Sequence, residues 1–204
     1  MTKRIFYLLI GTILSSLGIA GVLHCGLGAF GITLANKGLA QLFGVDIAIA
    51  NFITEGIMLL LALYYKEGIG WTSIASMTLS GVFISIFDKI LPYSPWLALL
   101  YFVAIIGWSY QGLAQFGHTA SNILNEALMK CTGKSLAFIR LIMESIFLII
   151  AWLTLPSMVN WFTILISFAC PYAIKYIYKL FRYEPKEVEH DYIITFNKKG
   201  ARNV

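Results

Sequence analysis

Residues 5–23 read IFYLLIGTILSSLGIAGVL, a run of 19 residues without a charged side chain. As an α-helix, such a run is long enough to cross a hydrocarbon core of about 30 Å. Lys3 and Arg4 come directly before it, and basic residues of this kind are typical of a cytoplasmic flank. No clear small-x-small cleavage site follows the run, so it predicts a membrane-spanning helix of the mature protein rather than a signal peptide.

The remainder of the chain has the same character. Of its 204 residues, 59% are hydrophobic and 12% are charged, whereas a soluble domain carries about 25% charged residues. Six apolar segments predict six spans: Ile5–Cys25, Ile47–Tyr65, Trp71–Lys89, Pro95–Phe116, Leu136–Leu155 and Trp161–Leu180. The chain is therefore expected to be an all-α, polytopic membrane protein with the lipid bilayer as its main partner.

The basic residues indicate how the chain is oriented. Seven of the 15 Lys and Arg residues lie at or beyond Lys175, and the segment from Tyr183 onward is polar and charged. Positive charge of this kind gathers on the cytoplasmic side, so both termini are predicted to be cytoplasmic. A short strand is possible at Tyr192–Phe196 in the tail. No basic face with stacking aromatic residues is present, which argues against nucleic-acid binding.

Two connections differ from the other loops. Residues 27–45 and 117–134 are long, and each contains a short amphipathic segment flanked by glycine, from Gly28 to Gly44 and from Gly117 to Gly133. Each predicts a short helix that either re-enters the membrane or lies flat at its interface. In a re-entrant helix the N-terminus carries partial positive charge into the interior, which suits an anionic ligand group.

These two segments coincide when the chain is shifted by 89 residues against itself. The shift aligns Asn36 with Asn125 and Glu55 with Glu144, together with three glycine pairs. We interpret this as a duplication, with one membrane repeat at 1–91, a second at 92–182 and a cytoplasmic tail at 183–204. Three spans in each unit would make the second an inverted repeat, as in many transporters. If the short helices cross the membrane instead, eight spans and parallel repeats result.

The most informative polar residues are Glu55 and Glu144, which lie about nine residues into their apolar segments. A carboxyl group near the bilayer midplane is costly and is usually explained by a pathway, a partner or a proton relay. Asn51 precedes Glu55 by one helical turn, and Arg140 precedes Glu144 in the same way, which suggests an Arg140–Glu144 ion pair. Glu55 has no such basic neighbour and is the better candidate for proton coupling. Alternatively, both glutamates serve only to join helices.

Other polar residues have plainer expected roles. His24 is expected to face water or to cap a helix, and Asp88 is expected to lie in the external headgroup region with Lys89. The three cysteines are far apart in sequence and predict neither a disulfide framework nor a metal site. No hydrolase, zinc-protease or phosphate-loop motif is present, so no enzyme and no cofactor is predicted.

Four stretches carry a family resemblance: Gly11–Gly31, Gly44–Gly56, Gly81–Asp88 and Asn122–Glu144. They resemble, in order, the first span with its Leu-Gly-rich exit, the entry to the next span, the G-x-x-x-D end of the third span and the matching second unit of the bacterial YczE/YyaS/YitT-like integral membrane proteins. The resemblance extends over about residues 5–180. It implies the fold and a bacterial cytoplasmic (inner) membrane location, and it implies no particular substrate.

The sequence therefore predicts a secondary-transporter-like permease for a small anionic or zwitterionic solute, with proton coupling through Glu55 as an option. The predicted site lies between the two units, at Glu55, Glu144, Asn36, Asn125, Asn51 and Arg140. Two alternatives are a substrate-binding membrane subunit of a multi-component uptake system and a non-transporting scaffold or accessory protein. The chain could act as a homo-oligomer or with a partner subunit.

Overall fold

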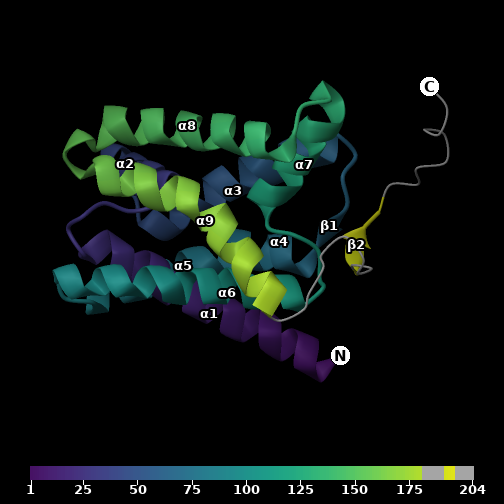
Figure 1. Cartoon of the computed structure of the whole chain (residues 1–204), viewed down its shortest axis with the longest axis horizontal. Helices are drawn as coiled ribbons and strands as arrows, with labels where there is room; N and C mark the ends of the chain where they lie inside the picture. Colours follow the sequence, from purple (N-terminus) through teal and green to yellow (C-terminus); the bar gives the residue numbers. More distant parts are fainter. Residues whose placement is uncertain (181–190, 196–204) are drawn as a thin grey trace.

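A computed structural model describes residues 1–180 and 191–195 of the chain, and nearly all of this part is helical (Figure 1). Five segments are long and apolar enough to cross a membrane: α1 (Thr2–His24), α3 (Ile47–Tyr64), the continuous run Trp71–Ile90, the run Pro95–Leu113 and α8 (Leu136–Thr154). A further apolar helix, α9, spans Trp161–Leu180. Each predicted apolar segment coincides with one of these helices, and no end differs by more than three residues.

Two of these spans are composite. The run Trp71–Ile90 consists of α4 (Trp71–Ala75), the π-helix η1 (Ser76–Ser80) and α5 (Gly81–Ile90). The run Pro95–Leu113 begins with the 3₁₀ turn η2 (Pro95–Leu99) and continues as α6 (Leu100–Leu113). A second 3₁₀ turn, η3 (Pro156–Met158), connects α8 to α9.

The outer surface of the bundle is apolar. Large apolar side chains on the long helices are more than half exposed, among them Leu60, Phe102 and Ile149. The interior is also apolar, with a central cluster that includes Leu23, Phe30 and Leu34. A soluble protein rarely exposes so much apolar surface, so this chain is a membrane protein.

The two predicted short helices are present as α2 (Gly31–Phe43) and α7 (Ala120–Thr132). Each has 13 residues and ends at a glycine in the left-handed region, Gly44 at φ 64° and Gly133 at φ 67°. A left-handed residue after the last helical turn lets its amide bond back to free carbonyls, and only glycine adopts this conformation without strain. Gly44 therefore ends α2, and the aligned Gly133 ends α7.

Backbone geometry recurs at the 89-residue spacing. The helices α2 and α7 begin and end at aligned positions, and so do the starts of α3 and α8. Gly26, Gly28 and Gly44 have positive φ, and so do the aligned residues Gln115, Gly117 and Gly133. Asp46 and Ser135, also aligned, both cap the following helix by accepting a backbone amide hydrogen.

The packing between helices is reciprocal. The helix α2 packs on α8, while α7 packs on α3. The closest pair is α1 and α6, where a Cβ atom on Gly18 would overlap the backbone of Ala104 and one on Gly107 would overlap the backbone of Ser15. Gly18 and Gly107 are themselves aligned by the 89-residue shift, so the close packing of α1 on α6 depends on an equivalent glycine in each helix.

The N-terminus and the described part of the tail meet at one end of the bundle (Figure 1). The Arg4 guanidinium lies 2.6 Å from the Asp191 carboxylate and donates to the carbonyls of Ala114 and Gln115 at the end of α6. Strand β2 (Tyr192–Ile194) pairs antiparallel with β1 (Ile69–Gly70). The short strand expected in the tail is therefore present over these residues, and most of the predicted tail region lies outside the described part.

Candidate functional site

Three of the predicted site residues form one buried cluster. The side-chain amide of Asn36, on α2, donates to the Asn51 side-chain oxygen on α3 at 3.2 Å. The Asn51 amide donates to the backbone carbonyl of Ser76, and the Ser76 hydroxyl lies 3.2 Å from the Glu55 carboxylate. Asn36, Asn51 and Glu55 are all less than 9% exposed. The predicted shared face of Asn51 and Glu55 is confirmed, and we refer to Asn36, Asn51, Glu55 and Ser76 as the Glu55 cluster.

The π-helix η1 accounts for the contacts that reach the backbone of this span. A π-helix inserts an extra residue into the turn, and carbonyls within it become available to side chains from other helices. Asn51 bonds the Ser76 carbonyl at the start of η1, and the Ser16 hydroxyl of α1 bonds the Ser80 carbonyl at its end. Sequence reasoning missed Ser76, whose only signal was the serine-rich stretch in the middle of the third apolar segment.

Glu144 lies at the N-terminus of α2. It is the ninth of the 19 residues in α8, and its Oε1 accepts a hydrogen bond from the Gly31 amide at 3.1 Å. The Ser167 hydroxyl of α9 is also bonded to Glu144 and accepts from the same Gly31 amide. A carboxylate is well placed at a helix N-terminus because free amide hydrogens and the helix dipole both favour negative charge there.

The helix α2 lies beside the second half of α8. A Cβ atom on Gly31 would meet Glu144 and Leu148, and one on Gly38 would meet Thr154. Because an α-helix rises 1.5 Å per residue, the ten residues from Glu144 to Thr154 place the start of α2 about 15 Å inside the end of α8. The acidic side chain at this helix N-terminus is the protein's own Glu144.

The predicted ion pair between Arg140 and Glu144 is wrong. Arg140 Nη2 instead donates to the Asn122 side-chain oxygen on α7 at 3.1 Å. The reason is the length of the arginine side chain, which reaches the neighbouring helix, while Glu144 is held by Gly31 and Ser167. Asn125 lies one turn after Asn122 on α7, so the Arg140 head group is close to the face that carries both asparagines.

Two buried atoms in this region lack hydrogen-bond partners among the described residues. They are Arg140 Nε, a donor, and Asn125 Oδ1, an acceptor. A buried donor or acceptor left unpaired costs about 1–3 kcal/mol. At the aligned positions in the first half, Asn51 and Asn36 bond each other. The second half therefore contains one buried donor, Arg140 Nε, and one buried acceptor, Asn125 Oδ1, and neither has a hydrogen-bond partner among the described residues.

Glu55 and Glu144 do not bond each other within the described part of the chain. Their hydrogen-bond partners come from different elements, Ser76 for Glu55 and Gly31 with Ser167 for Glu144. Apolar residues next to them do meet: Met58 of α3 belongs to a cluster against which Met143 and Phe147 of α8 pack. The Glu55 cluster and the hydrogen bonds of Glu144 are therefore separate polar groups joined by an apolar contact.

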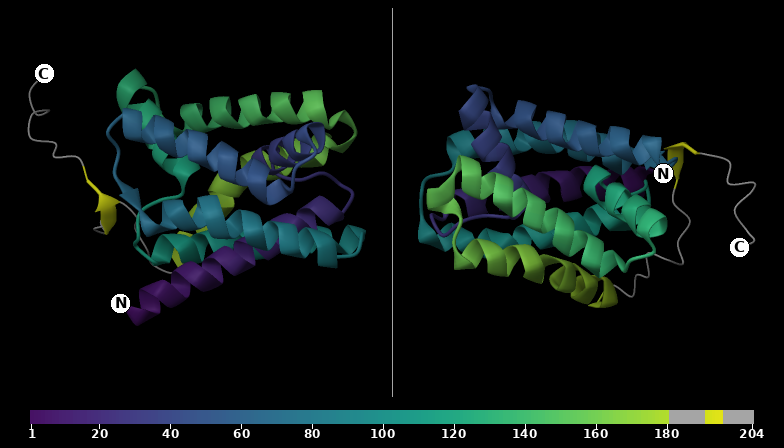
Figure 2. Two further views of the ribbon diagram at one scale, coloured as in Figure 1. Left: turned by 180° about the vertical axis from the view of Figure 1, so that it is seen from behind. Right: turned by 90° about the horizontal axis from the view of Figure 1, so that it is seen from above.

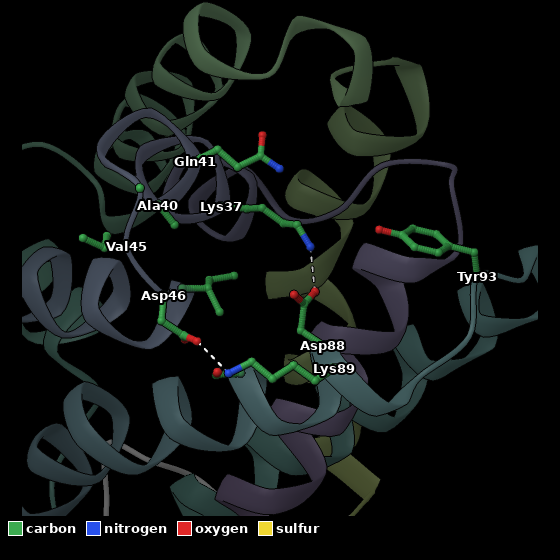
Figure 3. Close-up of a pocket in the computed structure, with 11 residues that line it drawn as sticks. Lys37, Ala40, Gln41, Val45, Asp46, Asp88, Lys89 and Tyr93 are labelled. Atoms are coloured by element: carbon green, nitrogen blue, oxygen red, sulfur yellow. Dashed lines mark hydrogen bonds and ion pairs between the residues drawn. The ribbon is translucent and has the colours of Figure 1, made fainter.

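A pocket of about 400 Å³ lies at one end of the bundle, between α2, α3 and α5. Figure 3 shows its two ion pairs, Lys37–Asp88 at 2.6 Å and Lys89–Asp46 at 2.9 Å. Asp88 and Lys89 are adjacent in sequence but have different partners, because Lys37 on α2 reaches Asp88 and Lys89 pairs with Asp46. None of the six predicted site residues lines this pocket.

His24 is also bonded to Asp88 at this end. Its Nε2 lies 3.0 Å from the carboxylate, and its ring stacks on Tyr93 at a centroid distance of 4.4 Å. The side chain is 4% exposed, so the expectation that His24 faces water is wrong. Asp88 thus connects α1, α2 and α5.

The Asp46 cap gives a prediction about pH. Hydrogen bonds from the Ser85 hydroxyl, the Ala48 amide and Lys89 lower the pKa of Asp46 from 3.8 to about 2. Because the folded protein binds this proton more weakly than the unfolded chain, the stabilisation by Asp46 is complete above pH 3.8 and is lost as pH falls toward 2. Thermal unfolding should show Asp46→Asn less stable than the unmodified protein at neutral pH, with the difference disappearing in strong acid. A difference that grows as pH falls would contradict this assignment.

Among the described residues, no group of three or more His, Cys, Asp or Glu side chains is arranged to hold a metal ion. In comparison with known proteins, residues 2–113 match a family described as a family of unknown function, DUF6198. The match covers more than half of the chain, from α1 through α6. No curated protein and no solved structure matches the chain.

Proposed function

This chain belongs to the family of unknown function DUF6198, and from its own residues we propose that it is a secondary-transporter-like permease. Its solute would be small and anionic or zwitterionic, and it would bind to the unpaired atoms Arg140 Nε and Asn125 Oδ1. The observation that supports this is the pair of complementary buried groups without partners. A solute carboxylate would accept from Arg140, and a solute ammonium or hydroxyl group would donate to Asn125.

We also propose that the chain is an inverted repeat. The aligned helix ends, the aligned positive-φ residues and the reciprocal packing of α2 on α8 and α7 on α3 support a common unit. The short helices lie toward opposite ends of the bundle (Figures 1 and 2). Consistent with this, Lys37 of α2 pairs with Asp88, whereas Lys130 of α7 pairs with Glu67 at the other end. An odd number of spans in each unit would produce this arrangement.

In this proposal α2 and α7 are re-entrant helices. The start of α2 about 15 Å inside the end of α8 supports this for the first half. Backbone ends at such a depth must be satisfied by protein or water, and the Gly31 amide is satisfied by Glu144 and Ser167. Glu144 would hold α2 while the site is closed and release it when a proton or a solute changes the local charge.

The proposed location is the bacterial cytoplasmic membrane with both termini in the cytoplasm. The Arg4–Asp191 ion pair, which places the N-terminus and the described tail at one end, supports an even number of spans. The basic residues near both ends of the sequence support the cytoplasmic side. The YczE/YyaS/YitT-like resemblance belongs to this proposal as well.

Uptake by purified protein tests the function. Proteoliposomes would be incubated with a ¹³C-labelled extract of bacterial metabolites, and the lumen would be analysed by mass spectrometry. We expect at least one small carboxylate-bearing solute to accumulate above the level in protein-free liposomes. Glu144→Gln should reduce this accumulation by about tenfold or more, since a neutral amide interacts more weakly with the α2 N-terminus. Glu126→Gln, a matched carboxylate change within α7 at a residue that lies 3.6 Å from His118, should retain it.

The other outcomes distinguish the two alternatives. A solute that is retained on the protein in detergent but never enters liposomes would favour a binding subunit of a multi-component uptake system. If no solute is either bound or accumulated, the permease proposal fails and a scaffold or accessory role is favoured. The described tail strand, which is paired with β1, would then be the first element to test for docking.

A further inference from the structure

The Glu55 cluster contains a buried carboxylate without a basic partner among the described residues. Among the described residues, its one hydrogen bond comes from the Ser76 hydroxyl. The other members, Asn36 and Asn51, are neutral amides. Burying a carboxylate in a membrane protein is costly unless an opposite charge or a proton accompanies it. One bound cation would therefore balance the negative charge of the Glu55 carboxylate in this cluster.

The cluster also has an unused oxygen. Asn36 is 3% exposed, and its Oδ1 has no hydrogen-bond partner among the described residues although its amide group donates to Asn51. The Ser76 hydroxyl and carbonyl lie in the same cluster, at the π-helix. Backbone carbonyls of unwound helix turns coordinate Na⁺ within transporters, and carboxylate and side-chain amide oxygens are typical ligands of other hard cations.

The second half supports the same conclusion by contrast. The 89-residue shift aligns Asn51 with Arg140, so a fixed positive charge lies one turn before Glu144. In the first half the same position holds a neutral amide. The first half therefore keeps a buried glutamate whose neighbours in the Glu55 cluster, Asn36, Asn51 and Ser76, are all neutral.

We propose that the Glu55 cluster is a Na⁺ site, with ligands from Glu55, the Asn36 side-chain oxygen and the Ser76 oxygens. Under the proposed permease function, this Na⁺ is the coupling ion that drives solute uptake. The site joins α2, α3 and η1, so Na⁺ binding would draw the short helix α2 toward the third span. Because Asn36 belongs to α2, whose N-terminus holds Glu144, the ion is coupled through one helix to the second polar cluster.

Binding of Na⁺ to purified full-length protein in detergent tests the site directly. Equilibrium dialysis with ²²Na⁺ should give about one saturable ion per chain. The thermal unfolding midpoint should rise with NaCl, by about 5 °C or more when Na⁺ is ~100-fold above its dissociation constant. Choline chloride at equal ionic strength should produce no such rise. Equal midpoints in both salts, without bound ²²Na⁺, would overturn the proposal.

Variants locate the ion. Glu55→Gln keeps the shape of the side chain and should lose both the bound ²²Na⁺ and the NaCl-dependent rise, and Asn36→Ala should weaken both. Asn51→Arg imports the residue aligned in the second half, and it should fold with a midpoint that no longer depends on NaCl. Glu126→Gln should respond to NaCl as the unmodified protein does. A full NaCl response in Glu55→Gln would refute this location.

These results separate the ion site from the function it would serve. Bound ²²Na⁺ that depends on Glu55, in a protein that accumulates no solute, would retain the site and remove the permease proposal. Solute uptake that is equal in NaCl and choline chloride, together with absent ²²Na⁺ binding, would retain the permease and remove the site. Protons would then be the coupling ion to examine at Glu55.

Discussion

Gly107→Ala is expected to lower the free energy of unfolding by about 1–3 kcal/mol, the usual cost of overpacking a closed contact. A Cβ atom at this position would overlap the backbone nitrogen of Ser15 and lie 2.7 Å from the Gly11 carbonyl oxygen. Backbone atoms cannot rotate away as a long side chain can, so α1 and α6 must separate. Close approach of small residues is a principal source of helix association in membranes, and separation loses it along the whole contact.

The matched control is Gly56→Ala. Among the described residues, the one atom within 4 Å of its Cβ atom would be the Met77 sulfur, at 3.7 Å. Alanine also favours helix over glycine by up to about 1 kcal/mol, so this variant should be neutral or slightly more stable. Thermal unfolding in detergent compares the two directly. If Gly107→Ala is as stable as Gly56→Ala, the tight contact between α1 and α6 is wrong.

The aligned glycine allows a sharper version of this experiment. Gly18→Ala should lose a similar amount, because its Cβ atom would overlap the backbone of Ala104. The double variant should lose less than the two single losses together, since helices already forced apart accept a second methyl group at lower cost. Strictly additive losses would show that the two contacts give way independently.

Arg140→Gln is expected to abolish solute uptake, with a loss of about 30-fold or more. Removing one partner of a buried, charged hydrogen bond costs about 2–5 kcal/mol in binding, and each 1.4 kcal/mol corresponds to a factor of ten. Glutamine still reaches toward Asn122, but it has no guanidinium Nε for a solute carboxylate. Arg140→Lys should recover only part of the uptake, because an ammonium group does not reproduce the planar, two-pronged geometry.

The loss must be separated from misfolding. Lys89→Gln removes one positive charge from an exposed side chain in the end pocket, and it should leave uptake within about twofold because an exposed ion pair such as Lys89–Asp46 contributes little. Asn125→Ala should resemble Arg140→Gln in uptake while retaining the Na⁺-dependent rise in unfolding midpoint. Full uptake by folded Arg140→Gln would remove the proposed solute site.

The sequence alone determined most of the local architecture. The apolar runs located the long helices, because helix length and hydrophobicity are properties of contiguous residues. Glycines located the ends of α2 and α7, since the left-handed conformation at Gly44 and Gly133 is a local requirement. The spacing of four also placed Asn51 and Glu55 on one face, as the Glu55 cluster bears out.

Only the tertiary structure decided which polar groups meet. Spacing along α8 favoured an Arg140–Glu144 pair, yet Arg140 bonds Asn122 and Glu144 bonds the Gly31 amide, 113 positions away in sequence. Likewise Lys37, rather than the adjacent Lys89, reaches Asp88. Helical periodicity specifies the face on which a side chain lies, but its partner depends on which helix packs against that face and at what height. That choice results from the packing of all the helices together, so no local pattern in the sequence contains it.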